Sequence, residues 1–297
     1  MKNEPPLIAI VGETASGKTS VAIKIAKQVD GEILCADSRT IYKQMDIGTA
    51  KPTISEQEGI PHHLIDIVEP NERFTVVQFQ KMAQQCIADI KNRGRVPIIV
   101  GGSGLYIDSV LYNFQFPKNA GAYGKEALEQ MNDVELTSLL NKHSLQNEQL
   151  NTKNKRHVVN ALLRLGASGS RSKLPSNAIV LGLKLDRDEL MRRISDRVDK
   201  MFDDGFIDEV KHIAEVYGWN NESMTGIGYR LARSHLDGDT SIDDVKEAFV
   251  KRDFSLAKRQ RTWFKRNADI KWFDDPEDLI SKAVEFAEQF DYNEANV

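Results

Sequence analysis

The chain has 297 residues, of which 40% are hydrophobic and 28% are charged, and its net charge is −4. This length and composition are typical of a soluble enzyme with one large α/β core and a smaller second lobe. No long apolar run precedes the first core strand, so we expect neither a signal peptide nor a membrane span. Cys35 and Cys86 lie in apolar stretches, which predicts reduced core thiols in a cytoplasmic protein and argues against disulfides or a metal site.

The first predicted element is a buried strand over Leu7–Val11, followed by G-x-x-x-x-G-K-T at Gly12–Thr19 and a helical pattern over Ser20–Gln28. Strand, glycine loop and helix in this order are the context of a phosphate-binding P-loop. Backbone N–H groups and the positive end of the helix would face phosphate oxygens. Lys18 adds a mobile charge, and the Thr19 hydroxyl is a candidate ligand for Mg²⁺. The motif predicts a di- or triphosphate ligand, which need not be a nucleotide.

Asp37 follows the second predicted strand, Glu32–Ala36, in the run Asp37-Ser38-Arg39. In a doubly wound sheet this strand end can lie beside the P-loop, so we expect Asp37 to face the phosphate site. Three interpretations fit an Asp here: a Mg²⁺ ligand, a general base, or a cap of the following turn. Because the run directly follows a strand, we favour the functional interpretations over the cap.

Four more apolar runs have the length of buried strands: Leu64–Val68, Pro97–Val100, Ile179–Leu185 and Ile270–Phe273. Helical patterns lie between most of the strands, among them Val76–Arg93 and Asp188–Tyr217. This alternation predicts an α/β fold, a P-loop doubly wound parallel sheet that binds ligands at the C-terminal ends of its strands.

Two further motifs flank these strands. After Val100 come Gly101, Gly102 and Ser103, where paired glycines allow close approach of a ligand and the serine offers a hydroxyl. A typical NTPase carries a metal-binding acid at this strand end, so the glycines count against a plain ATPase. His62 and His63 have no cysteine or acidic partner at ligand spacing, and we interpret them as structural or substrate-orienting.

Residues 114–175 interrupt the alternation with three polar helical patterns: Lys125–Gln130, Asp133–Lys142 and Lys155–Leu165. A loop rich in Gly, Ser, Arg and Lys follows at Gly166–Pro175. We interpret the segment as an inserted small helical lobe between two parts of the catalytic core, residues 1–113 and 176–297.

Positive charge is concentrated in Lys251–Arg266, which has seven Lys or Arg residues against one Asp. Basic pairs recur every seven residues, or two helical turns, and therefore share one face: Lys251-Arg252, Lys258-Arg259 and Lys265-Arg266. A stripe with so few acids to pair with favours nucleic acid over a solvated face. Upstream, Arg193 and Arg197 lie one turn apart and are candidates to clamp a diphosphate, with pairing to Glu189 or Asp196 as the alternative.

Together these motifs resemble the bacterial type of the tRNA dimethylallyltransferase (tRNA isopentenyltransferase) family. The matching runs follow the family's order over nearly the whole chain: residues 12–19, 36–39, 41–52, 61–66, 101–106, 193–201, 227–230 and 257–263. The run Ile-Tyr-Lys-Gln-Met-Asp-Ile-Gly-Thr-Ala-Lys-Pro at 41–52 is highly specific.

The resemblance implies transfer of a dimethylallyl group from dimethylallyl diphosphate to N6 of adenosine 37 of tRNA, next to the anticodon. The P-loop would hold the diphosphate of this donor with Mg²⁺ as cofactor. Lys18, Thr19 and Arg197 would stabilise charge on the departing diphosphate. Asp37 would take a proton from the weakly nucleophilic N6, and Ser103 would orient the adenine. The base must leave the anticodon stack to enter such a channel.

The resemblance also assigns binding residues. The donor residues are Gly12, Glu13, Thr14, Ala15, Ser16, Gly17, Lys18, Thr19 and Arg193. The tRNA residues are Asp37, Ser38, Arg39, Thr40, Ser103, Arg156, His157, Asn160, Gly228, Tyr229, Arg230, Lys258 and Arg259. The lobe and the basic helix of a monomer would grip the anticodon stem-loop by shape and phosphate.

The chain departs from the family's usual residues at Glu13 (usually Pro), Thr40 (Gln), Ser103 (Thr), His157 (Arg), Asn160 (Arg), Leu163 (Glu) and Leu231 (Gln or Glu). The donor motif keeps its glycines and lysine, so the departures bear mainly on tRNA contacts. Three alternatives stay open: a P-loop kinase, a prenyltransferase of free adenine nucleotides and a non-catalytic RNA-binding relative. The basic helix favours tRNA over a small acceptor, which would not require it.

Overall fold

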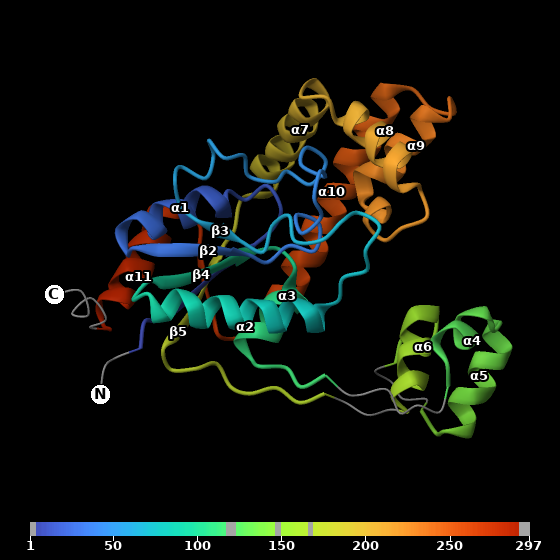
Figure 1. Cartoon of the computed structure of the whole chain (residues 1–297), viewed down its shortest axis with the longest axis horizontal. Coiled ribbons are helices and arrows are strands. Elements are labelled where there is room, and N and C mark those ends of the chain that lie inside the picture. The colour runs from blue at the N-terminus through green and yellow to red at the C-terminus, as the bar shows by residue number, and fades with distance from the viewer. Residues whose placement is uncertain (1–3, 117–122, 146–149, 166–168, 291–297) are drawn as a thin grey trace. The chain divides into compact units, whose positions relative to one another are not determined.

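The computed structural model describes residues 4–116, 123–145, 150–165 and 169–290. Within these ranges, six parallel strands form one sheet in the order β3-β2-β4-β1-β5-β6 (Figure 1). The strands are β1 (Leu7–Gly12), β2 (Gly31–Cys35), β3 (His62–His63), β4 (Val96–Gly101), β5 (Ala178–Leu183) and β6 (Ile270–Phe273). After β1 the chain continues to β2 and β3 toward one edge of the sheet, and after β5 it continues to β6 at the other edge. The C-terminal end of β1 therefore lies where doubly wound sheets bind ligands. The predicted fold class is confirmed.

Helices cover both faces of this sheet. Strands β1, β4 and β5 are buried along their whole length, as expected for inner parallel strands. The helices α1 (Lys18–Gln28) and α11 (Pro276–Glu288) pack on their Ile, Leu and Val side chains. The helices α2 (Val76–Asn92) and α3 (Gly104–Leu111) lie on the other side (Figure 1). This packing fixes the strand ends that carry the glycine loop and Asp37.

The prediction of a strand over Leu64–Val68 is wrong. Strand β3 ends at His63, and Leu64 and Asp66 adopt left-handed φ angles of 64° and 53°, which an extended strand does not allow. The backbone of this segment instead hydrogen-bonds to residues 40–41. The segment therefore supports the loop that follows β2.

The helix predicted over Asp188–Tyr217 is in fact two helices, α7 (Arg187–Asp203) and α8 (Phe206–Tyr217). Gly205, with a φ angle of 98°, interrupts the helical path between them. Three further helical elements follow: η1 (Ser223–Thr225), α9 (Ile227–Leu236) and α10 (Ile242–Phe264). Because α10 packs against α7 and α9 and also contacts β1, it links this helical group to the sheet.

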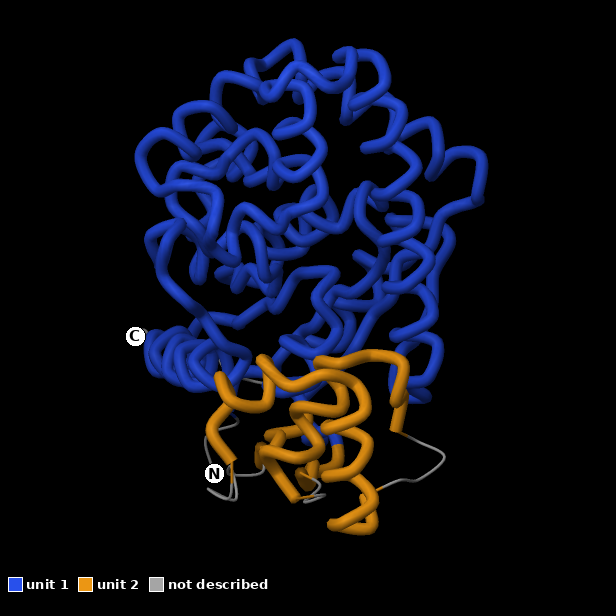
Figure 2. The backbone as a smooth tube through the Cα atoms, turned by 90° about the vertical axis from the view of Figure 1, so that its right-hand side faces the viewer, with its two compact units in different colours: residues 1–111, 174–297 blue, residues 112–173 orange. Residues whose placement is uncertain are grey.

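The backbone divides into two compact units, Met1–Leu111 with Leu174–Val297, and Tyr112–Lys173 (Figure 2). The described part of the smaller unit has three helices, α4 (Lys125–Gln130), α5 (Asp133–Lys142) and α6 (Lys155–Arg164). They enclose an apolar core of their own that includes Leu136, Leu140 and Leu163. The first residues of the loop predicted at Gly166–Pro175 lie outside the described residues, and Ser170 pairs with Gln115 in an antiparallel bridge.

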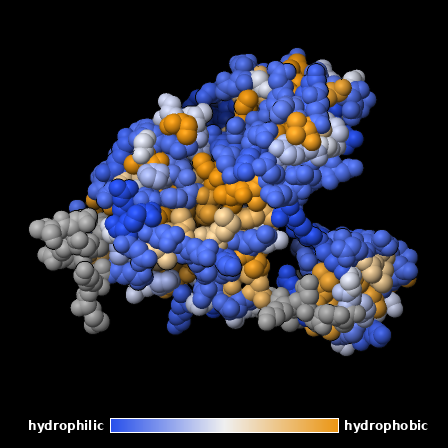
Figure 3. Space-filling model, in the orientation of Figure 1, coloured by the Kyte–Doolittle hydropathy of each residue, from blue (hydrophilic) through white to orange (hydrophobic). Residues whose placement is uncertain are grey.

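Apolar side chains are concentrated in the interiors of the two units. Hydrophilic residues cover much of the face that Figure 3 shows. Strongly exposed hydrophobic residues such as Ile54, Val134 and Val216 are far apart in the sequence. In the part of the chain that the structure describes, no helix has the length and apolarity needed to cross a bilayer.

Candidate active site

The glycine loop connects the C-terminal end of β1 to the first turn of α1. Gly12 and Gly17 have φ angles of 154° and 92°, which other residues rarely adopt. A Cβ atom at Gly12 would also collide with the carbonyl oxygen of Leu183 in β5. The backbone therefore curls tightly over the N-terminus of α1, where unpaired N–H groups favour a bound anion.

Lys18 begins α1 and is enclosed by the loop. Its ammonium group donates a hydrogen bond to the carbonyl oxygen of Glu13. Burial lowers the pKa of Lys18 to about 8, the neighbouring Asp37 carboxylate opposes this shift, and Arg197 adds to it. The next residue, Thr19, is exposed in the first turn of α1. Lys18 and Thr19 both line a cavity beside the glycine loop. The loop thus presents a cation and a hydroxyl side by side.

Two of the arginines on α7 are paired with acids of their own helix. Arg192 forms ion pairs with Glu189 and Asp196, at 2.8 and 2.7 Å. Arg193 pairs with Glu189 at 2.6 Å, and its Nη1 also lies 3.4 Å from the carbonyl oxygen of Ser16 in the loop. Arg193 therefore borders the P-loop, whereas Arg192 is neutralised on the helix surface.

Arg197 lies between the glycine loop and α10. Its Nη1 donates to the Thr14 hydroxyl at 2.8 Å, and its Nη2 pairs with Asp253 of α10 at 2.5 Å. Burial raises the pKa of Asp253, and Arg197 opposes that shift. A guanidinium held on both sides in this way is fixed in place at the edge of the loop.

Helix α10 also holds the loop directly. The Gln260 side-chain oxygen accepts a hydrogen bond from the N–H of Thr14 at 2.7 Å. The guanidinium of Arg261 forms an ion pair with the buried carboxylate of Glu13. Glu13, which departs from the usual Pro, thus has a partner in this chain. Two consecutive residues of α10 therefore bind two consecutive residues of the P-loop.

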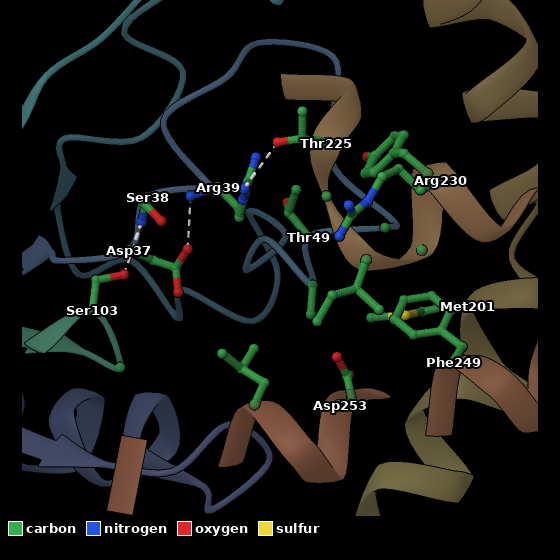
Figure 4. A pocket seen from close by; sticks show the side chains of 18 of the residues that line it. Asp37, Ser38, Arg39, Thr49, Ser103, Met201, Thr225, Arg230, Phe249 and Asp253 are labelled. Carbon is green, nitrogen blue, oxygen red and sulfur yellow. Dashed lines mark hydrogen bonds between the residues drawn. The ribbon is translucent and has the colours of Figure 1, made fainter. Parts of the chain in front are cut away.

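Asp37 lies in the loop after β2, beside the end of β4. Its Oδ1 accepts the N–H of Arg39 at 2.8 Å, so the aspartate does close a turn. Figure 4 shows the same carboxylate pointing into a cavity. The hydroxyl of Ser103 accepts the N–H of Ser38 at 3.1 Å and fixes this loop to the glycine turn after β4. The capping and the functional interpretations of Asp37 are therefore compatible.

Two cavities meet at Asp37. The P-loop cavity, about 240 Å³, is lined by loop residues that include Thr14, Lys18 and Thr19. The α9 cavity, about 380 Å³, is lined by residues that include Arg39, Gly228, Tyr229 and Arg230. Six residues line both: Asp37, Thr49, Ala50, Gly102, Arg197 and Gln260. Two ligands, one in each cavity, can therefore both reach Asp37.

The α9 cavity has a polar and an apolar side (Figure 4). On the polar side, Arg39 donates to the carbonyl oxygen of Glu222 at 3.0 Å and to the Thr225 hydroxyl at 3.3 Å. Met201 and Phe249 lie on the opposite side, close to Arg230. A flat aromatic ligand that carries hydrogen-bonding edges fits these surroundings.

Three polar atoms of residues that line the P-loop cavity are buried without a hydrogen-bond partner among the described residues: Oγ1 of Thr40, Nε2 of His62 and Nε of Arg197. Burial lowers the pKa of His62, and its Nδ1 lies 2.8 Å from the carbonyl oxygen of Ile60. His63 instead pairs with Glu32 at 2.6 Å. Over the described ranges, no group of three or more His, Cys, Asp and Glu side chains has the geometry of a metal site.

The basic residues in and directly after α10 differ in their surroundings. Lys251 pairs with Glu247 on its own helix, and the pair at 265–266 follows the end of α10. Lys258 and Arg259 are exposed and border a shallow surface cavity. Arg259 also lines the α9 cavity, so basic surface continues from α10 to the mouth of that cavity.

The candidate residues of the lobe lie in the smaller unit and do not line either cavity. Arg156 and His157 are exposed on α6, and Asn160 is half-buried. Leu163, where the family usually has Glu, is buried in the unit's apolar core. This departure therefore changes packing within the lobe.

The sequence analysis did not identify four residues that line the site. Thr49, Ala50 and Gln260 line both cavities, and Asp253 lines the α9 cavity. Asp253 is the one acid within a stretch of seven basic residues, and this contrast was a usable signal. Thr49 and Ala50 lie in the specific run at 41–52, and Gln260 lies in the matching run at 257–263. These runs were a usable signal, although the place of each residue in the site depends on contacts between distant parts of the chain.

A parallel sheet whose P-loop adjoins a second cavity across a carboxylate defines a P-loop protein with two neighbouring ligand cavities. The sequence model of the IPP transferase family matches residues 40–267. The chain belongs to this family, whose curated relatives here are tRNA dimethylallyltransferases.

Individual relatives agree with this assignment. The tRNA dimethylallyltransferase of Bacillus licheniformis is 39% identical over 293 residues, with 92% of each chain covered. The crystal structure of the tRNA isopentenylpyrophosphate transferase from Bacillus halodurans has 35% identity and a TM-score of 0.74, with 96% of each chain covered. A structure of a eukaryotic dimethylallyltransferase acting on tRNA has 26% identity and a TM-score of 0.77, covering 90% of this chain and 73% of that one.

Proposed function

We propose that this chain transfers the dimethylallyl group of dimethylallyl diphosphate to N6 of adenosine 37 in tRNA. The observation that carries the proposal is the pair of cavities that share Asp37 and Arg197. One cavity is walled by a diphosphate-binding loop, and the other continues into a basic surface. Family membership supplies the reaction class, and this geometry supplies a place for each substrate.

The donor's diphosphate binds in the P-loop cavity. The N–H groups of Ala15 and Gly17 and the ammonium of Lys18 hold its oxygens, and Arg197 approaches from α7. The exposed Thr19 hydroxyl fits one Mg²⁺ position, because Mg²⁺ commonly takes one or two protein oxygens together with phosphate oxygens and water. When bound, Mg²⁺ neutralises charge on the departing diphosphate.

The reaction takes place where the two cavities meet. A bond forms between N6 of the adenine and C1 of the donor as the bond from C1 to the diphosphate oxygen breaks. Asp37 accepts the proton that N6 loses, and Lys18 and Arg197 stabilise the negative charge of the diphosphate. The Ser103 hydroxyl accepts a hydrogen bond from the N–H of Ser38, so its own hydrogen is available to donate to the adenine.

The acceptor base enters through the α9 cavity. An adenosine within the anticodon loop must leave its stack, and Met201 and Phe249 then offer it an apolar face. Lys258 and Arg259 bind phosphates beside the entrance, and α6 of the smaller unit supplies a further contact to the stem-loop. The proposal includes a monomer, because one chain contributes both cavities and the basic surface, and it includes the cytoplasmic location expected from the sequence.

The proposal is tested by incubating the purified protein with labelled dimethylallyl diphosphate, Mg²⁺ and unmodified tRNA, followed by nucleoside analysis. We expect label in N6-isopentenyladenosine at position 37. Label on free adenine nucleotides would support a small-molecule prenyltransferase instead. Release of phosphate from ATP without transfer to RNA would support a kinase, and RNA binding without any transfer would support a non-catalytic relative.

Replacement of both Lys258 and Arg259 by alanine should weaken tRNA binding and flatten its dependence on salt. Each phosphate contact releases counterions, so the slope of log K against log salt should fall by roughly two. Binding is measured across a salt series. The matched control replaces Lys24 and Lys27 of α1, which removes the same charge from exposed positions paired with acids. An unchanged slope in the Lys258/Arg259 variant would remove these residues from the RNA interface.

A further inference from the structure

A single carboxylate, that of Glu209 on α8, accepts hydrogen bonds from two separate parts of the molecule. Its Oε2 accepts the N–H groups of Asp46 and Ile47, both at 2.7 Å. Its Oε1 accepts the N–H of Gly48 at 3.0 Å and the hydroxyl of Tyr229 at 2.6 Å. Three backbone donors and one phenol thus converge on a group that can only accept.

Both groups of donors belong to the walls of the α9 cavity. Gly48 and the next two residues, Thr49 and Ala50, line that cavity, and Thr49 and Ala50 also line the P-loop cavity. Tyr229 lines the α9 cavity from α9. Glu209 itself lines neither cavity. It can therefore affect the site only through the residues that it holds.

The packing around Glu209 leaves little freedom to either wall. A Cβ atom at Gly48 would collide with the rings of Phe206 and Tyr229. Burial, together with the neighbouring Glu209 carboxylate, holds the pKa of Tyr229 well above its usual value, so its hydroxyl keeps the proton that it donates. The 46–48 backbone and the Tyr229 ring are thus locked against each other.

We infer that Glu209 is a positioning residue that fixes the Gly48–Ala50 segment and Tyr229 as one wall of the acceptor's cavity. The inference rests on the proposed function, in which the adenine must enter this cavity in register with Asp37 and C1 of the donor. Misplacement of a reacting group by about 1 Å lowers the rate on the order of 100-fold. The contribution of Glu209 therefore concerns the acceptor, because the diphosphate contacts proposed above come from the glycine loop, Lys18 and Arg197, none of which Glu209 touches.

The test compares Glu209→Gln with the wild-type enzyme. Glutamine is close in size, but its NH₂ group places donors against the donors of residues 46–48, so the wall cannot keep its geometry. We expect kcat for an anticodon stem-loop RNA to fall on the order of 100-fold. The dissociation constant of inorganic diphosphate, measured by titration without RNA, should change less than about twofold, since the glycine loop, Lys18 and Arg197 are unaltered.

Two further variants separate positioning from general stability. Glu215→Gln removes the same charge from an exposed position of α8 and should leave kcat, KM and donor binding unchanged. Tyr229→Phe keeps the ring and removes one donor, with an expected loss of kcat on the order of tenfold. The loss in the double variant should be smaller than the product of the two single losses, because the Glu209→Gln and Tyr229→Phe variants both disrupt the hydrogen bond between Tyr229 and Glu209.

The outcomes are decisive in each case. A Glu209→Gln enzyme with kcat and KM for RNA near the wild-type values would overturn the inference. A parallel loss of donor binding and of transfer would also overturn it, because that pattern marks general unfolding. If Glu209→Gln does not yield folded protein, unchanged RNA kinetics of Tyr229→Phe overturn the inference. Absence of transfer by the wild-type enzyme would instead contradict the proposed function.

Discussion

Replacement of Asp37 by asparagine is expected to slow prenyl transfer by roughly 10²- to 10⁴-fold, the range over which a positioned general base acts. Asparagine keeps the oxygen that accepts the N–H of Arg39, so the loop after β2 should retain its shape. It cannot accept the proton from N6, whose lone pair is delocalised into the adenine ring. The measurement is the single-turnover rate with saturating donor and RNA.

The affinity of the Asp37→Asn variant for tRNA should stay close to that of the wild-type protein. Most of the RNA contact in the proposed complex is made by basic residues away from Asp37, on α10 and α6. A variant that transfers at nearly the wild-type rate would exclude Asp37 as the base. A loss of RNA affinity with a near-wild-type rate at saturating RNA would show that Asp37 holds the acceptor and has no role in proton transfer.

Replacement of Lys18 by alanine has the second largest expected effect, a fall in kcat/KM on the order of 10²- to 10³-fold. The ammonium is the charge enclosed by the loop, and it can turn from the carbonyl oxygen of Glu13 to a phosphate oxygen. The loss should include weaker binding of inorganic diphosphate, measured by calorimetry. Normal diphosphate affinity in the variant would contradict this placement of the donor.

The pH dependence of donor binding provides a second check on Lys18. Burial lowers the pKa of this residue to about 8, so the free enzyme carries the charge below that pH and loses it above. Diphosphate affinity should therefore decline as the pH rises through about 8. In Lys18→Arg the side chain stays charged, and the decline should disappear. A decline that persists in this variant would assign the titration to another group.

Local sequence patterns predicted the parts of the site that are built from neighbouring residues. The spacing of Gly12, Gly17 and Lys18 is decided by the geometry of one loop, and this geometry repeats wherever a backbone must approach a phosphate. Asp37 was found because it directly follows a strand. The same strand positions predicted the parallel sheet, since inner parallel strands are apolar along their whole length.

Contacts between distant residues decided what the sequence did not predict. Gln260 reaches the loop residue Thr14 across 246 positions, and Glu209 reaches Asp46 across 163. No periodicity encodes such pairings. The expected strand at Leu64–Val68 was wrong for a related reason, because the segment is apolar but follows the loop at residues 40–41 with left-handed turns. Tertiary contacts override local preference there.

The separate apolar core of Tyr112–Lys173 bears on how defects in this protein would be recognised. A substitution that melts this unit alone, for example a polar residue at Leu140, need not disturb the sheet, since each core is assembled from its own residues. The purified mutant would still bind diphosphate normally, yet a cell that depends on it would accumulate unmodified tRNA. A screen that measures only diphosphate binding would therefore not detect such mutants.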